Sequence, residues 1–500
     1  MTVALLHHLL DRQAADTPDA SAVRTKGRGW SYRDLRIRSM AYANWLRGHG
    51  VLPGDRVLIL APHEPETLAL IYAASRLGAI HVVLSDRTRP YHLEHILGDC
   101  EPRLVVASAR AVDVVAALAP PSVNVYGLDE LPADAPGEPN EPARLSIDPL
   151  ALIYTSGSTA MPKAVVSTHR QVLFTADAIQ QRLRYRPDDN VFCCLPLSFD
   201  YGLYQVFLCC VSGACLVLGD DEDAGPLLLS RLVDHDISVF PLVPSLAVTL
   251  ARLIARSHQF PPRLRMVTNT GAALPVTSST RLREMIPNLD VVSMFGLTEC
   301  KRVSIAEPNS DLSRPGSTGQ PLPDTEAYII DDNGARLPAG QVGELVVRGP
   351  NVMGGYWRAP EMTANRYRHD EFGQPVLHTG DRCRLDEDGN VYFVGRTDDI
   401  YKQSGFRVSS IEVEAAAMDV PGVELAAVLP PDNGNGARLV ATGTISAGSL
   451  ATELAVRLEE HKIPDDCRVL PELPLSVNGK IDKRALTDLL DARLQTEGIR

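Results

Sequence analysis

Short apolar runs alternate with amphipathic stretches through the first third of the chain. Residues 56–60 form an apolar run after a Pro-Gly-Asp turn, which predicts a buried strand. Residues 66–77 then place apolar side chains at helical spacing, and Gly78 is a typical helix C-terminus. Residues 80–84 and 104–107 repeat the strand pattern. This order of strand, helix and strand predicts a parallel sheet that is covered by helices.

The same alternation returns after residue 190, so two α/β halves are expected within the first three hundred residues. The predicted strands are residues 214–218, 237–240, 265–268 and 291–293, and the predicted helices are residues 227–234 and 245–255.

The later part of the chain has a different character. Residues 319–390 contain strand runs such as 343–348 between Gly and Asp-Gly turns, which predicts a small β-rich subdomain. The last hundred residues contain candidate strands at 424–429 and 439–445 and a candidate helix at 450–461. Residues 131–142 are rich in proline and acid and are typical of an exposed connector.

Composition excludes several classes of protein. The chain has 500 residues with 45% hydrophobic content, enough to bury more than one core. Its net charge of −13 argues against nonspecific binding of nucleic acid. The nine cysteines show no C-x-x-C spacing, which favours a reducing cytoplasm. Residues 1–16 form an amphipathic pattern and not a signal peptide, and no apolar stretch is long enough to span a membrane.

The most informative stretch is residues 154–164, which reads Tyr-Thr-Ser-Gly-Ser-Thr-Ala-Met-Pro-Lys-Ala. Hydroxyl groups, backbone N–H groups beside a glycine and a nearby ammonium suit a polyanion such as the triphosphate of ATP. A Ser/Gly-rich turn after a strand is the alternative for the hydroxyl run alone, but the following Pro162 and Lys163 favour phosphate binding. These residues do not match the Walker A motif. The loop candidates are Thr155, Ser156, Gly157, Ser158, Thr159 and Lys163.

This loop resembles the signature loop of the AMP-forming ligases, the adenylate-forming superfamily, whose pattern reads roughly YTSG(S/T)TGxPKG. Further motifs follow in that family's order, including residues 295–299 (FGLTE), 378–381 (HTGD), 395–398 (GRTD) and 478–483 (NGKIDK). The resemblance covers nearly the whole chain. Ala160 and Ala164 replace glycines of the pattern, and Ala160 would cost about 1–2 kcal/mol only if its backbone were left-handed.

The resemblance implies both a fold and a reaction. The fold is α/β: residues 1–396 form a large N-terminal domain of two helix-covered, mostly parallel sheets plus a β-rich subdomain. Residues 397–500 form a small, mobile α+β domain that turns about Asp398. ATP and a carboxylate first give an acyl-adenylate and pyrophosphate with the help of Mg²⁺. A thiol then attacks the activated carbonyl.

The resemblance also implies roles for individual residues. Lys480 is the catalytic lysine, and its ammonium offsets the repulsion between the carboxylate and the α-phosphate. Thr298 meets phosphate and Glu299 helps to hold Mg²⁺. Lys402 and Gly405 face the active site in the second half-reaction, where glycine lets a pantetheine arm pass. The remaining candidates for nucleotide binding are Gly271, Phe295, Asp381 and Arg396, the last two at the ribose.

Asp200 is the residue that indicates most about the carboxylic acid substrate. It falls where amino-acid-activating members carry an aspartate that pairs with the substrate ammonium, although some acyl ligases share this segment. The other candidates for the acid site are Tyr201, Tyr204, Thr270, Met294 and Arg302. Arg302 either holds a second anionic group or is a salt-bridged structural residue, and the second role is the more common one.

Three functional hypotheses remain open from the sequence. The leading one is activation of an amino acid or another small functionalised acid, followed by transfer to the phosphopantetheine of a separate acyl or peptidyl carrier protein. The second is an acyl- or aryl-CoA ligase, favoured by Leu297 and by residues 401–412 (YKQSGFRVSSIE). The third is a nucleotide-binding member without ligase chemistry, against which Lys480, Glu299 and Asp381 argue. No hypothesis involves a nucleic acid or a membrane partner.

Overall fold

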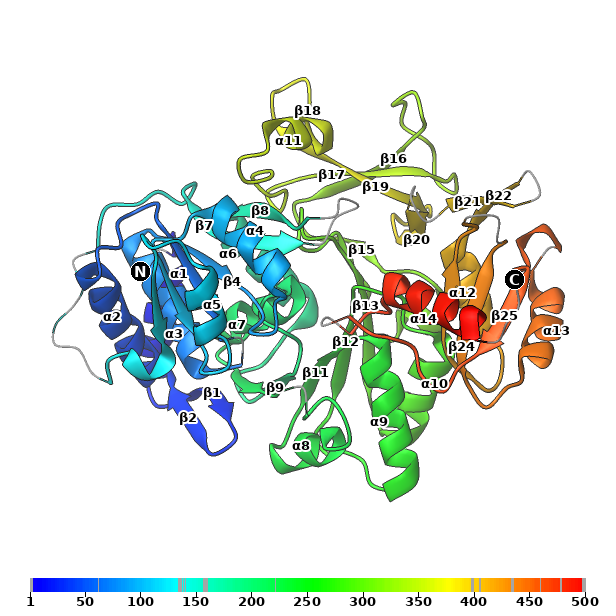
Figure 1. Cartoon of the computed structure of the whole chain (residues 1–500), viewed down its shortest axis with the longest axis horizontal. Coiled ribbons are helices and arrows are strands. Elements are labelled where there is room, and N and C mark those ends of the chain that lie inside the picture. The colour runs from blue at the N-terminus through cyan, green and yellow to red at the C-terminus, as the bar shows by residue number, and fades with distance from the viewer. Residues whose placement is uncertain are drawn as a thin grey trace.

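The computed structural model describes residues 3–61, 63–133, 137, 139, 141–155, 161–220, 222–396, 400–403, 406–432, 436–458, 460–476 and 479–496. Figure 1 shows three regions: the N-terminal α/β layers at the left and centre, a β-rich region at the top and a C-terminal region at the right. The fold is mixed α/β, as predicted.

The first sheet contains six strands in the order β6-β5-β3-β4-β7-β8. Its strands are parallel except for the hairpin of β7 and β8. Alternate residues of β3 pack on opposite faces of this sheet. Val57 and Ile59 belong to one hydrophobic cluster, and Leu58 and Leu60 belong to another. The elements are β3 (Arg56–Leu60), α3 (Pro65–Leu77), β4 (Ile80–Val83), α4 (Pro90–Cys100), β5 (Leu104–Ala107), α5 (Val112–Leu118), β6 (Asn124–Gly127), β7 (Pro149–Thr155) and β8 (Lys163–Thr168).

The second sheet contains nine strands in the order β15-β14-β13-β12-β11-β9-β10-β1-β2. The start of the chain joins this sheet, because β1 pairs in parallel with β10. The strands are β1 (Ser21–Thr25), β2 (Arg28–Ser31), β9 (Asn190–Cys193), β10 (Cys215–Leu218), β11 (Val239–Leu242), β12 (Met266–Asn269), β13 (Asp290–Phe295), β14 (Ser304–Ile305) and β15 (Gln320–Pro321). The helices beside it are α1 (Leu6–Asp16), α2 (Tyr32–Gly48), α6 (His169–Leu183), α7 (Asp200–Ser212), α8 (Leu228–Asp234), α9 (Pro244–Ser257) and α10 (Val276–Met285).

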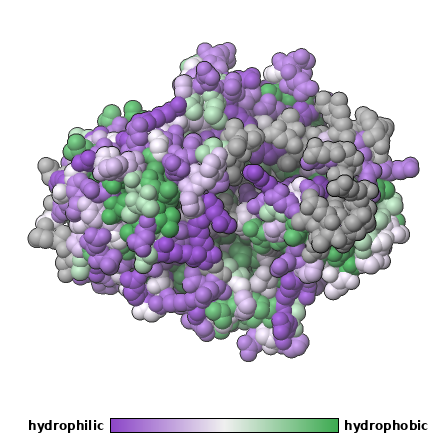
Figure 2. Space-filling view, in the orientation of Figure 1, coloured by the Kyte–Doolittle hydropathy of each residue, from purple (hydrophilic) through white to green (hydrophobic). Residues whose placement is uncertain are grey.

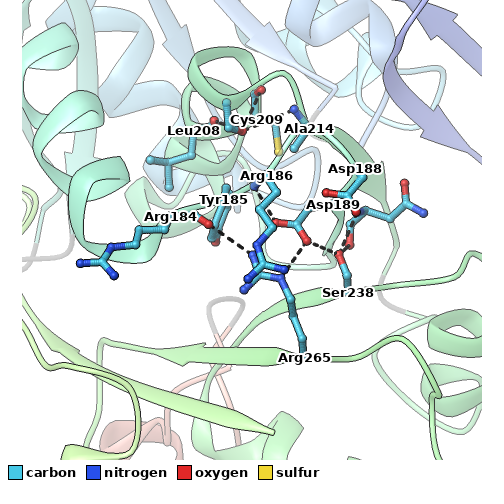
Figure 3. Close-up of polar contacts among 12 residues, drawn as sticks. Arg184, Tyr185, Arg186, Asp188, Asp189, Leu208, Cys209, Ala214, Ser238 and Arg265 are labelled. Atoms are coloured by element: carbon cyan, nitrogen blue, oxygen red, sulfur yellow. Dashed lines mark hydrogen bonds and ion pairs between the residues drawn. The ribbon is translucent and has the colours of Figure 1, made fainter. Parts of the chain in front are cut away.

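A buried carboxylate holds three strands of the second sheet together at one end (Figure 3). Asp189, just before β9, accepts hydrogen bonds from Arg265 at 3.0 and 2.5 Å and from the Ser238 hydroxyl at 2.7 Å. Burial opposes ionisation, but these hydrogen bonds outweigh it and keep the pKa of Asp189 below its usual value. The ion pair therefore anchors the starts of β9, β11 and β12 to one another.

The predicted β-rich subdomain is an antiparallel sheet in the order β16-β17-β19-β18, with β20 paired to β19. Its elements are β16 (Glu326–Ile330), β17 (Gly343–Arg348), α11 (Pro360–Arg366), β18 (Tyr367–His369), β19 (Pro375–Leu385) and β20 (Val391–Arg396).

The C-terminal region contains β21 (Ile400–Gln403), β22 (Phe406–Ser409), α12 (Ser410–Met418), β23 (Val423–Leu429), β24 (Arg438–Gly443), α13 (Ala447–Arg457), β25 (Asp466–Val469) and α14 (Lys483–Thr496). Two hydrophobic clusters consist only of residues from this last region.

Two predicted elements are displaced along the chain. The strand expected at residues 237–240 is displaced to Val239–Leu242, where it aligns in parallel with β12. The helix expected at residues 450–461 begins earlier and ends at Arg457. Ser446 caps its start by accepting a hydrogen bond from the Ser449 N–H. The chain becomes extended at Leu458 because it must turn back to form β25, which pairs in parallel with β24.

Polar residues cover most of the face in Figure 2, with smaller apolar areas between them. In the part of the chain that the structure describes, no helix combines the length and the apolar character that a membrane span requires.

Candidate active site

The predicted phosphate loop connects the two strands of a hairpin. Strands β7 and β8 pair in antiparallel register, with Thr155 opposite Lys163. Ser156, Gly157, Ser158, Thr159 and Ala160 lie outside the described residues. Ala164 is buried in β8 opposite Tyr154, so the alanine is accepted as an ordinary strand residue there.

Lys163 belongs to a compact group with Glu299 and Tyr356. The Lys163 ammonium donates a hydrogen bond to the Tyr356 hydroxyl at 2.9 Å, and that hydroxyl donates to Glu299 Oε1 at 2.6 Å. Lys163 Nζ and Glu299 Oε1 are 3.6 Å apart. Burial lowers the pKa of Lys163, although the negative charge of Glu299 opposes this shift. A cation and a carboxylate therefore lie together at the start of β8.

Backbone pairing explains how Tyr356 reaches this group. Gly354 N–H donates to the Val166 carbonyl, and Trp357 N–H donates to the Ala164 carbonyl, both at 2.9 Å. This segment therefore runs antiparallel to β8, with Tyr356 bridged to Val165. Glu299 lies in the turn that follows β13.

The two candidates for ribose binding are neighbours on adjacent strands. Asp381 on β19 lies opposite Arg396 on β20, and Asp381 Oδ1 and Arg396 Nε are 3.2 Å apart. Asp381 is buried, whereas the Arg396 side chain is half-exposed. Phe295, at the end of β13, packs against Phe393 of β20 with ring centres 5.1 Å apart. The antiparallel sheet thus reaches the end of the second sheet. Thr298 lies half-buried in the turn after Phe295.

Lys480 lies against the same region from the C-terminal side. Its Nζ lies 5.4 Å from the centre of the Phe199 ring. Gly271 has a positive φ of 87°, and a Cβ there would lie 3.1 Å from Lys480 Cε, so glycine permits this approach. Burial lowers the pKa of Lys480; Asp200 opposes this shift and Arg396 adds to it. Lys480 therefore interacts electrostatically with both the acid candidate and the ribose candidate.

The acid side of the site contains three buried charges. Asp200, the first residue of α7, is 7% exposed, while Lys301 and Arg302 are 1% and 4% exposed. Arg302 donates to the Thr270 hydroxyl at 3.2 Å and lies 5.4 Å from the centre of the Tyr201 ring. Among the described residues, Lys301 Nζ and Arg302 Nε have no hydrogen-bond partner. No ion pair of Arg302 with another described residue is present, which disfavours its interpretation as a salt-bridged structural residue.

The other predicted residues of the acid site are buried around these charges. The Tyr201 hydroxyl is engaged by the Thr268 carbonyl and hydroxyl, both at 2.7 Å. Tyr204 is buried in contact with Phe207, and Met294 is buried on β13.

Lys402 and Gly405 are the residues predicted for the second half-reaction. Lys402 lies on β21, in a hairpin with β22. Gly405 and the predicted hinge Asp398 lie outside the described residues.

Sequence reasoning missed two members of the site. Lys301 has no pattern that distinguishes it from a solvated lysine, yet it is buried with a left-handed backbone at φ 62°. Tyr356 was not among the candidates predicted from the sequence. Its contact with Lys163 depends on segments that are 193 residues apart in the chain.

The residues present fit a magnesium ion that accompanies ATP. Glu299 offers one carboxylate beside Lys163, and its contacts within the described residues use Oε1, which leaves Oε2 for a ligand. Magnesium binds few protein oxygens and retains several waters, so one carboxylate suits it.

Comparison with known proteins is consistent with this geometry. The profile of a family described as "AMP-binding enzyme" matches residues 10–357. Feruloyl-CoA synthase from Amycolatopsis sp is 31% identical over 481 residues, 94% of this chain and 96% of that protein. Malpinin synthetase from Mortierella alpina is 30% identical over 516 residues, which cover 96% of this chain. The chain spans only 6% of that relative's length.

A solved structure shows higher identity over a shorter range. The crystal structure of VinN is 41% identical, covers 78% of this chain and 98% of its own, and superposes with a TM-score of 0.73. VinN has also been solved in complex with L-aspartate, and that structure is 40% identical to this chain with the same coverage and TM-score.

Proposed function

This chain belongs to the AMP-binding enzyme family and is an adenylate-forming ligase, and we propose that it activates an amino dicarboxylic acid similar to aspartate. Asp200 binds the substrate ammonium, and Lys301 and Arg302 bind the carboxylate that does not react. One observation carries this proposal: a buried carboxylate lies with two buried cations whose nitrogen atoms Nζ and Nε lack partners among the described residues. The L-aspartate complex of VinN supports it.

Charge complementarity is the physical reason for this choice. Buried charges cost several kcal/mol each unless they are paired, so a ligand that pairs them gains strongly over one that does not. A plain fatty or aryl acid offers nothing to any of the three charged groups. An amino acid without a second carboxylate satisfies Asp200 but leaves both cations unmatched. Only an acid that carries both groups complements the site.

In the first half-reaction the reacting carboxylate attacks the α-phosphorus of ATP, and pyrophosphate leaves. The role of Lys480 is to neutralise the charge that builds on the phosphoryl oxygens, and its buried position next to Gly271 and Phe199 supports this role. Asp381 and Arg396 hold the ribose, and Lys163 contacts the phosphates. Glu299 would hold a magnesium ion, which would supply positive charge to the leaving pyrophosphate.

For the second half-reaction we propose transfer to the phosphopantetheine thiol of a separate carrier protein. Residues 1–396 and 397–500 act as two domains, and rotation about Asp398 replaces Lys480 by the segment from Lys402 to Gly405. Transfer to CoA is the second candidate, favoured by the match to feruloyl-CoA synthase along 96% of that protein. Incubation of the loaded enzyme with either a carrier protein or CoA, followed by mass spectrometry of the thioester, distinguishes the two.

Pyrophosphate exchange into ATP tests the choice of acid. We expect exchange with aspartate or an isomer to exceed exchange with alanine and with succinate by at least about tenfold, since each lacks one of the two groups. Exchange only with acids that lack an amine would overturn the role of Asp200.

Lys480→Ala tests the catalytic lysine. We expect the exchange rate to fall by about 10²–10³-fold, because one stabilising charge at the transition state is lost. Lys462→Ala is the matched control, since Lys462 pairs with Glu412 at 2.6 Å within the C-terminal region. An unchanged exchange rate in a correctly folded Lys480→Ala variant would contradict the mechanism.

A further inference from the structure

The Tyr356 hydroxyl lies between two opposite charges of the nucleotide site. It accepts a hydrogen bond from Lys163 Nζ at 2.9 Å and donates one to Glu299 Oε1 at 2.6 Å. The two charged atoms stay 3.6 Å apart, beyond the 2.7–2.9 Å of a direct ammonium–carboxylate hydrogen bond. The ion pair is therefore separated by a hydroxyl group.

The position of this hydroxyl is fixed by the fold. Tyr356 is 5% exposed, and its backbone segment pairs with β8, which also carries Lys163. Its N–H donates to the Thr363 hydroxyl at 2.9 Å, and its ring packs edge-on against Tyr367. A hydroxyl on such a constrained ring cannot move far, so it sets the distance between its two partners.

We propose that Tyr356 is a positioning residue that prevents Lys163 and Glu299 from forming a direct ion pair. Without the hydroxyl, the ammonium and the carboxylate would close on each other in this half-buried position, where charges attract strongly. A closed pair offers less of the ammonium to the triphosphate and less of the carboxylate to the accompanying cation. This inference rests on the proposed role of the site in ATP binding.

Tyr356→Phe tests the inference because it removes the hydroxyl and keeps the ring. The first measurement is calorimetric binding of α,β-methylene-ATP with magnesium, which needs no turnover. We expect the Kd to rise about ten- to hundredfold, as for loss of a hydrogen bond to a charged group. We also expect pyrophosphate exchange to need more magnesium and more ATP, while the KM for the acid stays within twofold.

Tyr367→Phe is the matched control. Tyr367 is also buried and packs on Tyr356, but within the described part of the chain its hydroxyl donates to a backbone group, the Glu299 carbonyl at 3.5 Å, and to no charged side chain. We expect this variant to bind the analogue within twofold of the wild type. An unchanged Kd for Tyr356→Phe, or an equal loss in both variants, would overturn the positioning role.

These results also separate this inference from the proposed function. Wild-type protein that binds the analogue but exchanges pyrophosphate with no acid would contradict the proposed activity, while the binding measurement would still decide the role of Tyr356. Wild-type exchange together with an unchanged Tyr356→Phe variant would contradict the inference alone.

Discussion

At the scale of the residue, the arrangement of charge in the acid site determines what it can bind. Asp200, Lys301 and Arg302 are each less than a tenth exposed, and among the described residues the Arg302 guanidinium donates one hydrogen bond, to the neutral Thr270 hydroxyl. An arginine held in this way keeps most of its donors for a ligand. Because its planar group binds carboxylates in a bidentate manner, Arg302 is the better candidate to orient the second carboxylate, with Lys301 adding charge.

At this scale, a prediction concerns the substitution Arg302→Met. This change keeps much of the side-chain volume and removes the charge, so we expect kcat/KM for an amino dicarboxylic acid to fall about ten- to hundredfold. Exchange with a neutral amino acid should not fall, because it makes no contact with the guanidinium. Arg314→Met is the control, since Arg314 is 45% exposed and pairs with Asp388. An equal loss for both substrates would contradict a role in selectivity.

At the scale of the element, one buried arginine joins three helices of the N-terminal layer. Arg76, near the end of α3, is 2% exposed. It contacts Asp11 of α1 at 2.5 Å, the Ser39 hydroxyl of α2 at 3.0 Å and Glu141 of the connector at 2.8 Å. The Arg76 guanidinium therefore donates to partners from three other segments, which explains how a charged residue is tolerated in a mostly buried helix.

The second prediction is that Arg76→Met destabilises the fold. Removal of one partner of a buried ion pair leaves the other uncompensated, so we expect the free energy of unfolding in urea to fall by about 3 kcal/mol. Arg28→Met is the comparison, because Arg28 also bridges two carboxylates, Glu64 and Glu66, but is 52% exposed. We expect that change to cost less than about 1 kcal/mol. Equal losses would show that burial does not control the strength of these pairs.

At the scale of the whole molecule, two buried histidines link stability to pH. His81 lies in β4, and His169 begins α6 and accepts a hydrogen bond from the Leu6 N–H at 3.1 Å. Burial lowers the pKa of His81 from 6.5 to about 3, and His169 adds to this shift. Burial also lowers the pKa of His169 from 6.5 to about 4, with His7 adding to it.

The third prediction follows from the sign of these shifts. Below pH 6.5 the unfolded chain takes up protons at both histidines, whereas the folded chain does not until about pH 4. We therefore expect the free energy of unfolding to fall as the pH decreases from 6.5 towards 4, by about 1.4 kcal/mol per pH unit for each histidine. His81→Leu should remove one of these contributions. A pH dependence equal to that of the wild type would exclude His81 as its source.

Local patterns in the sequence were enough for most elements and for the fold class. The helix predicted at residues 66–77 is observed at Pro65–Leu77, because its apolar spacing ends at Gly78, which adopts the left-handed C-cap at φ 67°. The strands at residues 56–60 and 104–107 were predicted without error, because buried parallel strands are short continuous apolar runs. Errors arose where long-range pairing decides the boundary, as at β11, or where a cap shifts a helix, as at Ser446.

The sequence by itself determined the α/β class, the motifs of the proposed nucleotide site and the candidate Asp200, since these depend on residue types at fixed local spacing. Only the tertiary structure decided that β1 joins the second sheet, that Lys301 is buried beside Arg302, and that Tyr356 separates Lys163 from Glu299. These features arise from contacts between segments far apart in the chain. Burial and electrostatics depend on such contacts, and no local pattern encodes them.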